Sequence, residues 1–358
     1  MLLPLVSIAA ALIISLICTP FARKLAIRYK IVALPNHRTI HNNTTPKLGG
    51  LSIYLAFASA LIILAVYDQP MSDFGGLLLG GGVVLFVGLF DDILGLSCYR
   101  KIIGQTIAAI VAVYFGFVAE TVYLPSGESL SLGLWALPLS LFWIVGITNA
   151  VNLLDGLDGL ATGFTIIISM FICAGAVMSQ NYDLAVVSVI LIATCSGFLK
   201  YNFSPAKIFL GDMGSLFLGF LLACLSLKAF VVPGSGVHTL VLLGIFMIPL
   251  ADTFLSIFRR LGNGRHPFWA DKQHIHHRLL DAGMKQVTAV LVIYGATILC
   301  GVAGLLYFAT NIQIGILLYA GLALLFLVAL GHLHCFDFLK TKVTYKKPEE
   351  VHLQKHAD

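Results

Sequence analysis

The sequence predicts an all-α, polytopic membrane protein with about eleven transmembrane helices. Hydrophobic residues make up 59% of the 358 positions and charged residues only 11%, and the apolar residues form runs long enough for a helix to cross a bilayer. Because successive spans cross the membrane in opposite directions, the segments between them lie alternately on its two sides. All but one of the 22 lysines and arginines fall in segments on the same side. Because basic residues in short loops collect on the cytoplasmic side, we expect the N-terminus outside and the C-terminus in the cytoplasm.

The expected spans follow the apolar runs in order, each ending at turn or polar residues. They cover 2–22, 48–67, 74–92, 102–119, 134–151, 159–178, 184–200, 213–231, 238–258, 288–308 and 312–331. The first is expected to be a signal-anchor helix and not a cleaved signal peptide, because its basic residues, Arg23 and Lys24, follow the apolar run.

The spans organise the chain as one membrane domain over 1–331 followed by a basic cytoplasmic tail over 332–358. The sequence pI of about 8.8 reflects membrane orientation and contact with anionic lipid, so nucleic acid is not an expected partner. The cytoplasmic loops that we expect to form a functional site are 23–47, 93–101, 149–159, 200–212 and 259–287.

Five carboxylates fall at cytoplasmic ends of the expected helices. They are Asp91, Asp92, Asp155, Asp158 and Asp212. Any one of them is typical of an ordinary helix cap. Ionisable groups at membrane depth are costly without a partner, however, so the set together indicates a functional site. The adjacent pair needs a nearby cation, and either Lys101 or a divalent metal would supply it. Magnesium suits a site with few carboxylates in which substrate phosphates complete the shell.

Two further motifs surround these acids. In "KIFLGDMGSLFLGF" Asp212 lies between glycines at the start of a helix, where free backbone amides favour phosphate. In "NAVNLLDGLDGLATG" two amides, Asn149 and Asn152, precede the two acids at intervals of three residues. The amides suit contacts to a base or sugar, and the acids suit a metal or ribose hydroxyls.

The segment "GRHPFWADKQHIHHRLLDAG" has three interpretations. A zinc site lacks a clear fourth ligand, and a solvated loop would give the cluster no role. We prefer a loop that binds phosphate and sugar through side-chain donors. Its donors are Arg265, His274, His276, His277 and Arg278. Asp252, seven residues before Arg259 on a similar helix face, is expected to form an orienting salt bridge with it.

Four motifs in this order, "FDDILGL", "NAVNLLDGLDGLATG", "FLGDMGSLFLGF" and "HIHHRLL", resemble those of the polyprenyl-phosphate N-acetylhexosamine-1-phosphate transferases of glycosyltransferase family 4. The resemblance covers most of the chain, from Thr45 to Leu280. The segment "RHPFWADKQHIHHRLL" is similar to that of the bacterial UDP-GlcNAc enzymes that start O-antigen, common antigen or teichoic acid. The muramoyl-pentapeptide transferase branch typically carries three consecutive histidines here, whereas this chain has Ile275 between His274 and His276.

The resemblance implies transfer of GlcNAc-1-phosphate from UDP-GlcNAc to undecaprenyl phosphate with release of UMP. It implies Mg²⁺ or Mn²⁺ as cofactor, and a bacterial inner membrane with the site facing the cytoplasm. A homodimer is one arrangement that it leaves open. The implied roles are metal ligation by Asp212 and Asn152, catalysis beside the lipid phosphate by Asp91, Asp92, Asp155 and Lys101, nucleotide binding by Asn149, Gly156, Leu157, Asp158 and Phe209, and sugar-phosphate binding by the histidine loop.

Two other functions remain as alternatives. One is the phospho-MurNAc-pentapeptide transferase reaction of peptidoglycan synthesis. The other is a transporter, since buried acids in polytopic proteins relay ions, although a transporter predicts charges near the bilayer midplane. Within the transferase reaction, both direct attack by the lipid phosphate and a covalent aspartyl-phosphate route are compatible with the sequence.

Overall fold

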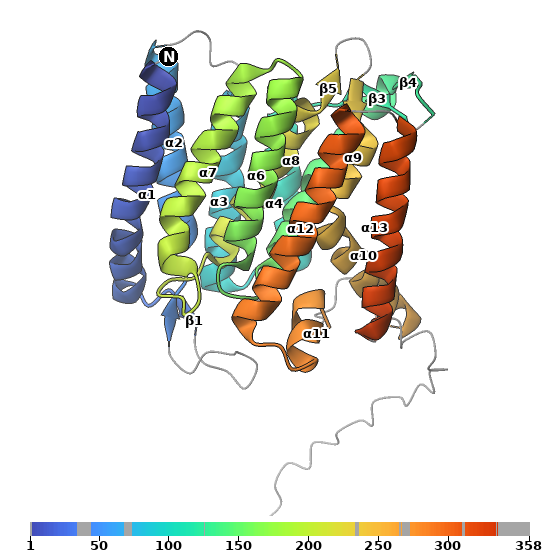
Figure 1. Ribbon diagram of the computed structural model, residues 1–358. Coiled ribbons are helices and arrows are strands. Elements are labelled where there is room, and N and C mark those ends of the chain that lie inside the picture. Colours follow the sequence, from blue (N-terminus) through green and yellow to red (C-terminus); the bar gives the residue numbers. More distant parts are fainter. Residues whose placement is uncertain are drawn as a thin grey trace, which may run out of the picture.

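The computed structural model describes residues 2–33, 44–67, 74–124, 126–232, 236–264, 266, 273–309, 312–333 and 335. The chain forms a bundle of helices whose directions alternate, so that β1 and the short helix α11 lie at one end and β3, β4 and β5 lie at the other (Figure 1). We call the first end the site end, because the predicted functional residues gather there. The all-α prediction is confirmed.

The helices account for nearly all of the described elements. They are α1 (Leu2–Arg28), α2 (Gly49–Tyr67), α3 (Gly75–Leu94), α4 (Cys98–Tyr114), α5 (Ala136–Leu154), α6 (Leu160–Met178), α7 (Tyr182–Asn202), α8 (Gly211–Ala229), α9 (Thr239–Ile245), α10 (Met247–Gly262), α11 (Ile275–Asp281), α12 (Gln286–Ala309) and α13 (Ile312–His332). A helix lies in each of the eleven predicted ranges. Eight of the described helices are long and apolar enough to span a membrane, and α9 with α10 makes a ninth if the pair is one span.

The ninth predicted span differs from expectation because it is broken. The axes of α9 and α10 differ by 76°, with Phe246 between them. Beyond the break, α10 buries Asp252, Ser256 and Arg259 on one face and exposes Phe254 and Phe258 on the other. A two-faced helix of this kind brings polar side chains to the site end while its apolar face is left for lipid.

The predicted loops are shorter than expected because the helices continue into them. Asn149 and Asn152 lie in α5, Lys101 lies in α4 and Asp212 lies in the first turn of α8. The predicted loop that starts at residue 23 begins only after Arg28, where α1 ends. Side chains on helices are held more rigidly than side chains on loops, which suits a site that must align two substrates.

Short strands at the two ends were not predicted. At the site end β1 (Val32–Ala33) pairs with β2 (Thr45–Pro46). At the other end, β3 (Thr121–Tyr123), β4 (Ser129–Ser131), β5 (Val231–Val232) and β6 (Gly236–His238) form a sheet in the order β4-β3-β6-β5. Among the described strand pairs, β3 with β6 is the parallel one. Each strand has two or three residues, too few for a period-2 pattern to show in the sequence.

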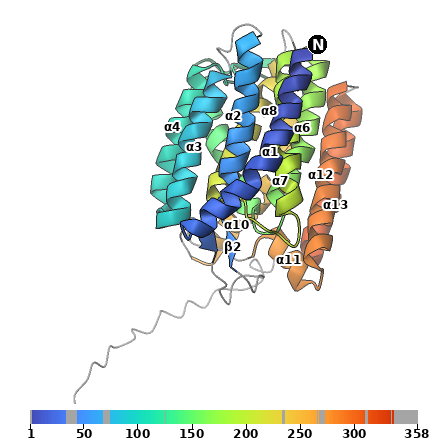
Figure 2. The same ribbon diagram turned by 90° about the vertical axis from the view of Figure 1, so that its left-hand side faces the viewer.

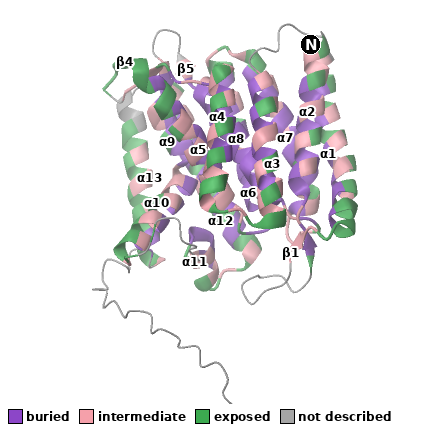
Figure 3. Ribbon diagram, turned by 180° about the vertical axis from the view of Figure 1, so that it is seen from behind, coloured by how far each residue is buried: buried purple, intermediate pink, exposed green. Residues whose placement is uncertain are grey.

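Helix α8 forms the centre of the bundle, packed among α2, α3, α5 and α6 (Figures 1 and 3). Every residue of α8 is buried except Asp212 and Lys228. Glycines let the backbones approach: a Cβ on Gly88 of α3 would lie 2.3 Å from the Cα of Met213, and one on Gly50 of α2 would lie 2.4 Å from the nitrogen of Gly214. These contacts wedge the first turn of α8 between the ends of α2 and α3.

The outer helices expose large apolar side chains along their length. Leu317, Leu324 and Leu325 of α13 are more than half exposed, as are Leu5 and Ile17 of α1. Figure 2 shows α1 and α2 together on one side of the bundle, with α12 and α13 away from them. A surface this apolar matches a hydrocarbon environment, so the structure agrees with a multi-pass membrane protein.

Candidate functional site

The predicted acids and amides from separate helices come together at the site end. The end of α3 supplies Asp91 and Asp92, the start of α8 supplies Asp212, and the end of α5 supplies Asn152 and then Asp155. The convergence predicted from the sequence is therefore present for these three helices.

Asp212 lies at the middle of this group. Its Oδ1 accepts a hydrogen bond of 2.6 Å from Nδ2 of Asn152, and the same Nδ2 lies 2.7 Å from the Ser215 hydroxyl, one turn along α8. The carboxyl groups of Asp212 and Asp91 also lie within hydrogen-bonding reach of each other. Ser215 was missed by sequence reasoning, although its position three residues after Asp212 places both on one helix face.

Asp91 and Lys101 form a half-buried ion pair across the turn between α3 and α4. Lys101 Nζ lies 2.6 Å from Asp91 Oδ2, and the backbone nitrogen of Leu96 donates to Asp91 Oδ1 at 2.7 Å. The turn therefore holds one carboxylate and one ammonium rigidly beside Asp212. Lys101, one of the two cations expected beside the acidic pair, therefore lies next to Asp91, while the metal expected as the other stays a prediction.

Asp92 has a different environment from its neighbour. Its Oδ2 accepts a hydrogen bond of 3.1 Å from the backbone nitrogen of Met213, so it caps the first turn of α8, and Lys47 Nζ lies 3.9 Å from its Oδ1. Gly211 has φ +73°, and a Cβ there would lie 2.6 Å from Asp92 Oδ2. Glycine is thus required for this close approach. Lys47 was missed as a site residue, although it is the only cation in "TPKLGG".

Asp155 lies in the turn between α5 and α6. Burial of its carboxyl group, together with the nearby carboxylates of Asp212 and Asp92, raises its pKa to about 8. A carboxyl group with this pKa is protonated in part near neutral pH. Binding of a cation among these acids would favour its charged form.

The predicted nucleotide residues occupy several different environments. Gly156 is exposed, whereas Leu157 and Asp158 are buried, and Asp158 Oδ2 accepts from the backbone nitrogen of Ala206 at 3.0 Å. Phe209 is half-buried in the same segment, which leads into α8. The α5–α6 turn and the α7–α8 connection are therefore joined through Asp158.

Asn149 is turned toward a neighbouring helix. Its side-chain amide and that of Gln105 on α4 donate to each other, and its Nδ2 also lies 2.8 Å from the carbonyl of Val145. This reciprocal pair ties α5 to α4 beneath the carboxylates. Gln105 was missed, because a glutamine inside an apolar run gives no sign of its partner.

The histidine segment is held by α10. Asp252 Oδ2 lies 2.9 Å from Nδ1 of His274, and Asp252 Oδ1 accepts from the backbone nitrogen of Ile275 at 2.8 Å. The expected partner of Asp252 was Arg259, and that prediction is wrong. Arg259 instead donates to the backbone carbonyl of Gln273 at 2.5 Å. The histidine segment lies over the polar face of α10, so Asp252 and Arg259 both bond to it and not to each other.

His276 joins the histidine segment to the α5–α6 turn. A Cβ on Gly156 would overlap the His276 imidazole, so the ring lies directly on that glycine. The His276 ring is parallel to that of His274 within 3°, with 5.8 Å between centroids, and lies 4.3 Å from that of His277. Burial, helped by His277, lowers the pKa of His276 to about 3, so the ring is neutral at physiological pH. It offers a hydrogen bond and no charge.

The remaining predicted donors lie around this segment. Arg278 donates to Oε1 of Gln273 at 2.8 Å, and His277 follows His276 in α11. Arg265 lies outside the described residues. The segment thus presents its basic residues at the site end, next to the turn that carries Asp155.

The oxygen donors of this site fit a hard divalent cation such as Mg²⁺ or Mn²⁺ better than a softer metal that takes thiolate or imidazole ligands. Among the described residues, no group of three or more His, Cys, Asp or Glu side chains is arranged to hold a metal by itself. Asp212 and Asp91 nevertheless approach each other, and Oδ1 of Asp92 is buried with no hydrogen-bond partner in the described part of the chain. A few carboxylate oxygens with room for phosphate and water are what magnesium uses in nucleotide sites.

Fold and site together define a polytopic membrane protein with a carboxylate-rich site at one end of an apolar bundle. A sequence model described as "Glycosyl transferase family 4" matches residues 74–230. The chain is 37% identical to a probable undecaprenyl-phosphate N-acetylglucosaminyl 1-phosphate transferase of Bacillus subtilis, covering 81% of this chain and 80% of that one.

Two further relatives extend the comparison. A decaprenyl-phosphate N-acetylglucosaminephosphotransferase of Mycolicibacterium smegmatis is 36% identical, over 82% of this chain and 79% of its own. A phospho-N-acetylmuramoyl-pentapeptide-transferase of Desulfitobacterium hafniense is 32% identical, over 73% and 83%. The chain belongs to glycosyl transferase family 4, and the resemblance stated from the four motifs is confirmed.

Proposed function

We propose that this protein transfers GlcNAc-1-phosphate from UDP-GlcNAc to undecaprenyl phosphate, giving undecaprenyl-diphospho-GlcNAc and UMP. The product would start a cell-surface polysaccharide such as O-antigen, common antigen or teichoic acid. The observation that carries the proposal is the meeting of Asp91, Asn152 and Asp212 from three helices at one end of a membrane bundle. The two relatives named for N-acetylglucosamine phosphate transfer support this choice of donor.

The reaction needs alignment and charge neutralisation more than covalent help from the protein. An oxygen of the lipid phosphate attacks the β-phosphorus of UDP-GlcNAc, the bond from that phosphorus to the bridging oxygen breaks, and UMP leaves with the bond electrons. Lys101 and Lys47 place positive charge beside the reacting phosphates. Asp91, held by Lys101 and Leu96, orients the lipid phosphate, which is already largely dianionic near pH 7.

Asp212, with Asn152 through its carbonyl oxygen, would hold Mg²⁺ or Mn²⁺. The ion would supply neutralisation of the charge that develops on the diphosphate. Asp92 and Lys47 fix the first turn of α8 and with it the direction of Asp212. His276 on Gly156 closes the donor side of the site and offers a neutral hydrogen bond to the sugar phosphate.

The proposed location is the bacterial inner membrane with the site end facing the cytoplasm. The concentration of basic residues in the segments at this end supports it, because such residues collect on the cytoplasmic side. The water-soluble donor would reach the site from the cytoplasm and the oily acceptor from within the bilayer.

The test is release of UMP by the purified full-length protein with undecaprenyl phosphate. UDP-GlcNAc and UDP-MurNAc-pentapeptide are offered separately, with Mg²⁺, with Mn²⁺ and with EDTA. We expect UMP from UDP-GlcNAc only, and only with a divalent metal. Asp183→Asn, an exposed acid at the opposite end, is the matched control for site variants. Absence of UMP from UDP-GlcNAc under all conditions would overturn the proposal.

The phospho-MurNAc-pentapeptide reaction is the second candidate, favoured by the similarity to the Desulfitobacterium hafniense protein. UMP from the pentapeptide donor alone would select it. Transport is the weaker alternative, because the described site carboxylates lie at one end of the bundle.

A further inference from the structure

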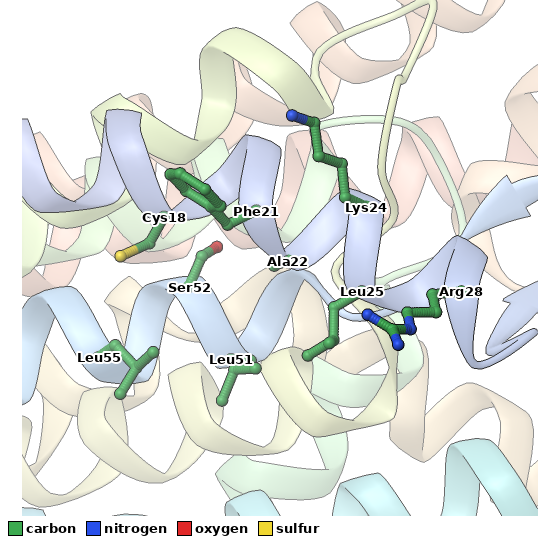
Figure 4. A pocket seen from close by; sticks show the side chains of 9 residues that line it. All are labelled: Cys18, Phe21, Ala22, Lys24, Leu25, Arg28, Leu51, Ser52 and Leu55. Atoms are coloured by element: carbon green, nitrogen blue, oxygen red, sulfur yellow. The ribbon is translucent and has the colours of Figure 1, made fainter.

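A groove lies between α1 and α2, near their site ends and apart from the carboxylates. It has a volume of about 370 Å³, in the range of pockets that hold small ligands. Its lining residues are Cys18, Phe21, Ala22, Lys24, Leu25, Arg28, Leu51, Ser52 and Leu55. Figure 4 shows Arg28 at one end of the groove and Cys18 with Leu55 at the other.

The walls of the groove are apolar. Phe21 is 63% exposed and Leu55 is 43% exposed, although both belong to helices apolar enough to span a membrane. The single hydroxyl in the wall, that of Ser52, is buried and already bonded to the carbonyl of Gly49 and to Thr19. Apart from the Cys18 thiol, the wall away from Lys24 and Arg28 therefore offers no free donor, which suits a hydrocarbon chain and not a sugar or nucleotide.

The charged end of the groove lies where the apolar run of α1 ends. The expected first span ends at residue 22, so Lys24 and Arg28, one helical turn apart on α1, follow the hydrocarbon region. Both side chains are exposed, and neither has an acidic partner among the described residues. Lys24 Nζ lies 5.8 Å from the centre of the Phe21 ring, which keeps this cation beside the apolar wall.

We propose that this groove binds an anionic phospholipid, with an acyl chain along the apolar wall and the phosphate at Lys24 and Arg28. The occupant follows from the charge, because two exposed cations at one end of an apolar channel complement a negative headgroup on a hydrocarbon chain. Arg23, next to Lys24 in α1, donates to the backbone carbonyl of Lys207 in the α7–α8 connection. A lipid on α1 would thus steady the segment that leads to Asp212.

The experiment is native mass spectrometry of the purified full-length protein titrated with phosphatidylglycerol or phosphatidylcholine. We expect phosphatidylglycerol to bind about tenfold more tightly than phosphatidylcholine. The double variant Lys24→Gln, Arg28→Gln should lose this preference. Leu55→Trp, which fills the groove and keeps the charges, should weaken the binding of both lipids. Lys200→Gln is the matched control, since Lys200 is an exposed cation at the same end whose Nζ lies 5.8 Å from the Tyr201 ring.

Equal binding of the two lipids to the wild-type protein, or an unchanged preference in the double variant, would overturn the proposal. If Leu55→Trp alters the oligomeric state while phosphatidylglycerol binding persists, a second copy of the chain occupies the groove and the proposal is wrong. UMP release does not decide it, so the lipid site and the proposed reaction fail independently.

Discussion

Among single residues, Asp212 has the most constrained position in the site. Its Oδ1 accepts a hydrogen bond of 2.6 Å from Nδ2 of Asn152, and its carboxyl group lies beside that of Asp91. It belongs to the first turn of α8, a helix that is buried almost throughout. An asparagine at this position has the same shape and can still accept the bond from Asn152. Replacing Asp212 by asparagine therefore tests the contribution of its charge.

Asp212→Asn is expected to lower turnover by roughly 100-fold or more, because the charge that would hold the cation is lost while the volume is kept. UMP release at saturating substrates measures it, with Asp183→Asn as the control. Activity near that of the control at ordinary magnesium would remove Asp212 from the metal site.

Asp91→Asn is expected to slow catalysis more than it weakens the binding of UDP-GlcNAc. Asparagine can still accept from Leu96 through Oδ1 but no longer pairs with Lys101 as an ion. We expect kcat to fall about 100-fold, with a change in KM for UDP-GlcNAc of a few-fold at most. An unaltered kcat would contradict the orienting role.

His276 gives a pH-dependent stability whose sign follows from its environment. Its pKa in the folded protein is about 3, below the ordinary 6.5, so between these values the unfolded chain binds a proton that the folded chain does not. Its contribution to stability is therefore complete above pH 6.5 and is lost as the pH falls toward 3.

The variant His276→Asn should show a smaller drop in Tm between pH 7 and pH 5 than the wild type shows. His332→Asn, at an exposed position in α13, is the control and should behave as the wild type. Equal drops in Tm for His276→Asn and the wild type would mean that His276 is not held neutral by the fold.

At the scale of elements, the broken pair α9 and α10 explains how a membrane helix reaches a cytoplasmic loop. The bend of 76° frees the polar face of α10, and Asp252 then holds His274 and the first backbone amide of α11. Asp252 is a positioning residue, since it acts on the donor side of the site through His274 and His276.

Asp252→Asn is expected to raise KM for UDP-GlcNAc about tenfold with a smaller change in kcat, because a charge-assisted hydrogen bond worth roughly 2 kcal/mol is weakened. Thr253→Val, which removes only a bond to the carbonyl of Pro249, is the matched control. A loss of folded protein with unchanged KM in the folded fraction would show a purely structural role.

At the scale of the molecule, alternation of the helices puts all motifs at one end and the β3–β6 sheet at the other (Figure 1). The basic residues predict that the motif end is cytoplasmic. Lys207 and Glu128 are exposed at opposite ends and allow this to be measured.

A membrane-impermeant thiol reagent should label Glu128→Cys in intact cells and Lys207→Cys only after the membrane is permeabilised. The unmodified protein sets the background, since its seven cysteines are buried or half-buried. The reverse pattern would invert the proposed orientation.

The sequence by itself determined the membrane class, the helix in each apolar range and the family, because hydrocarbon forces the backbone into helices and long apolar runs record it. It also named Asp91, Asp92, Asp155 and Asp212, since acids are conspicuous in such a chain. The span count of eleven stays a prediction; within the described residues, up to nine spans meet the length and hydropathy expected of a crossing.

Only the tertiary structure decided which groups touch. Several contacts of the site join segments that lie apart in the sequence. They are those of Lys47 with Asp92, Gln105 with Asn149, His274 with Asp252 and His276 with Gly156. Hydropathy reflects whether each residue prefers lipid or water, and this preference can be read along the sequence. The contact partner of a side chain depends on how several helices pack together, and no local sequence pattern contains that information.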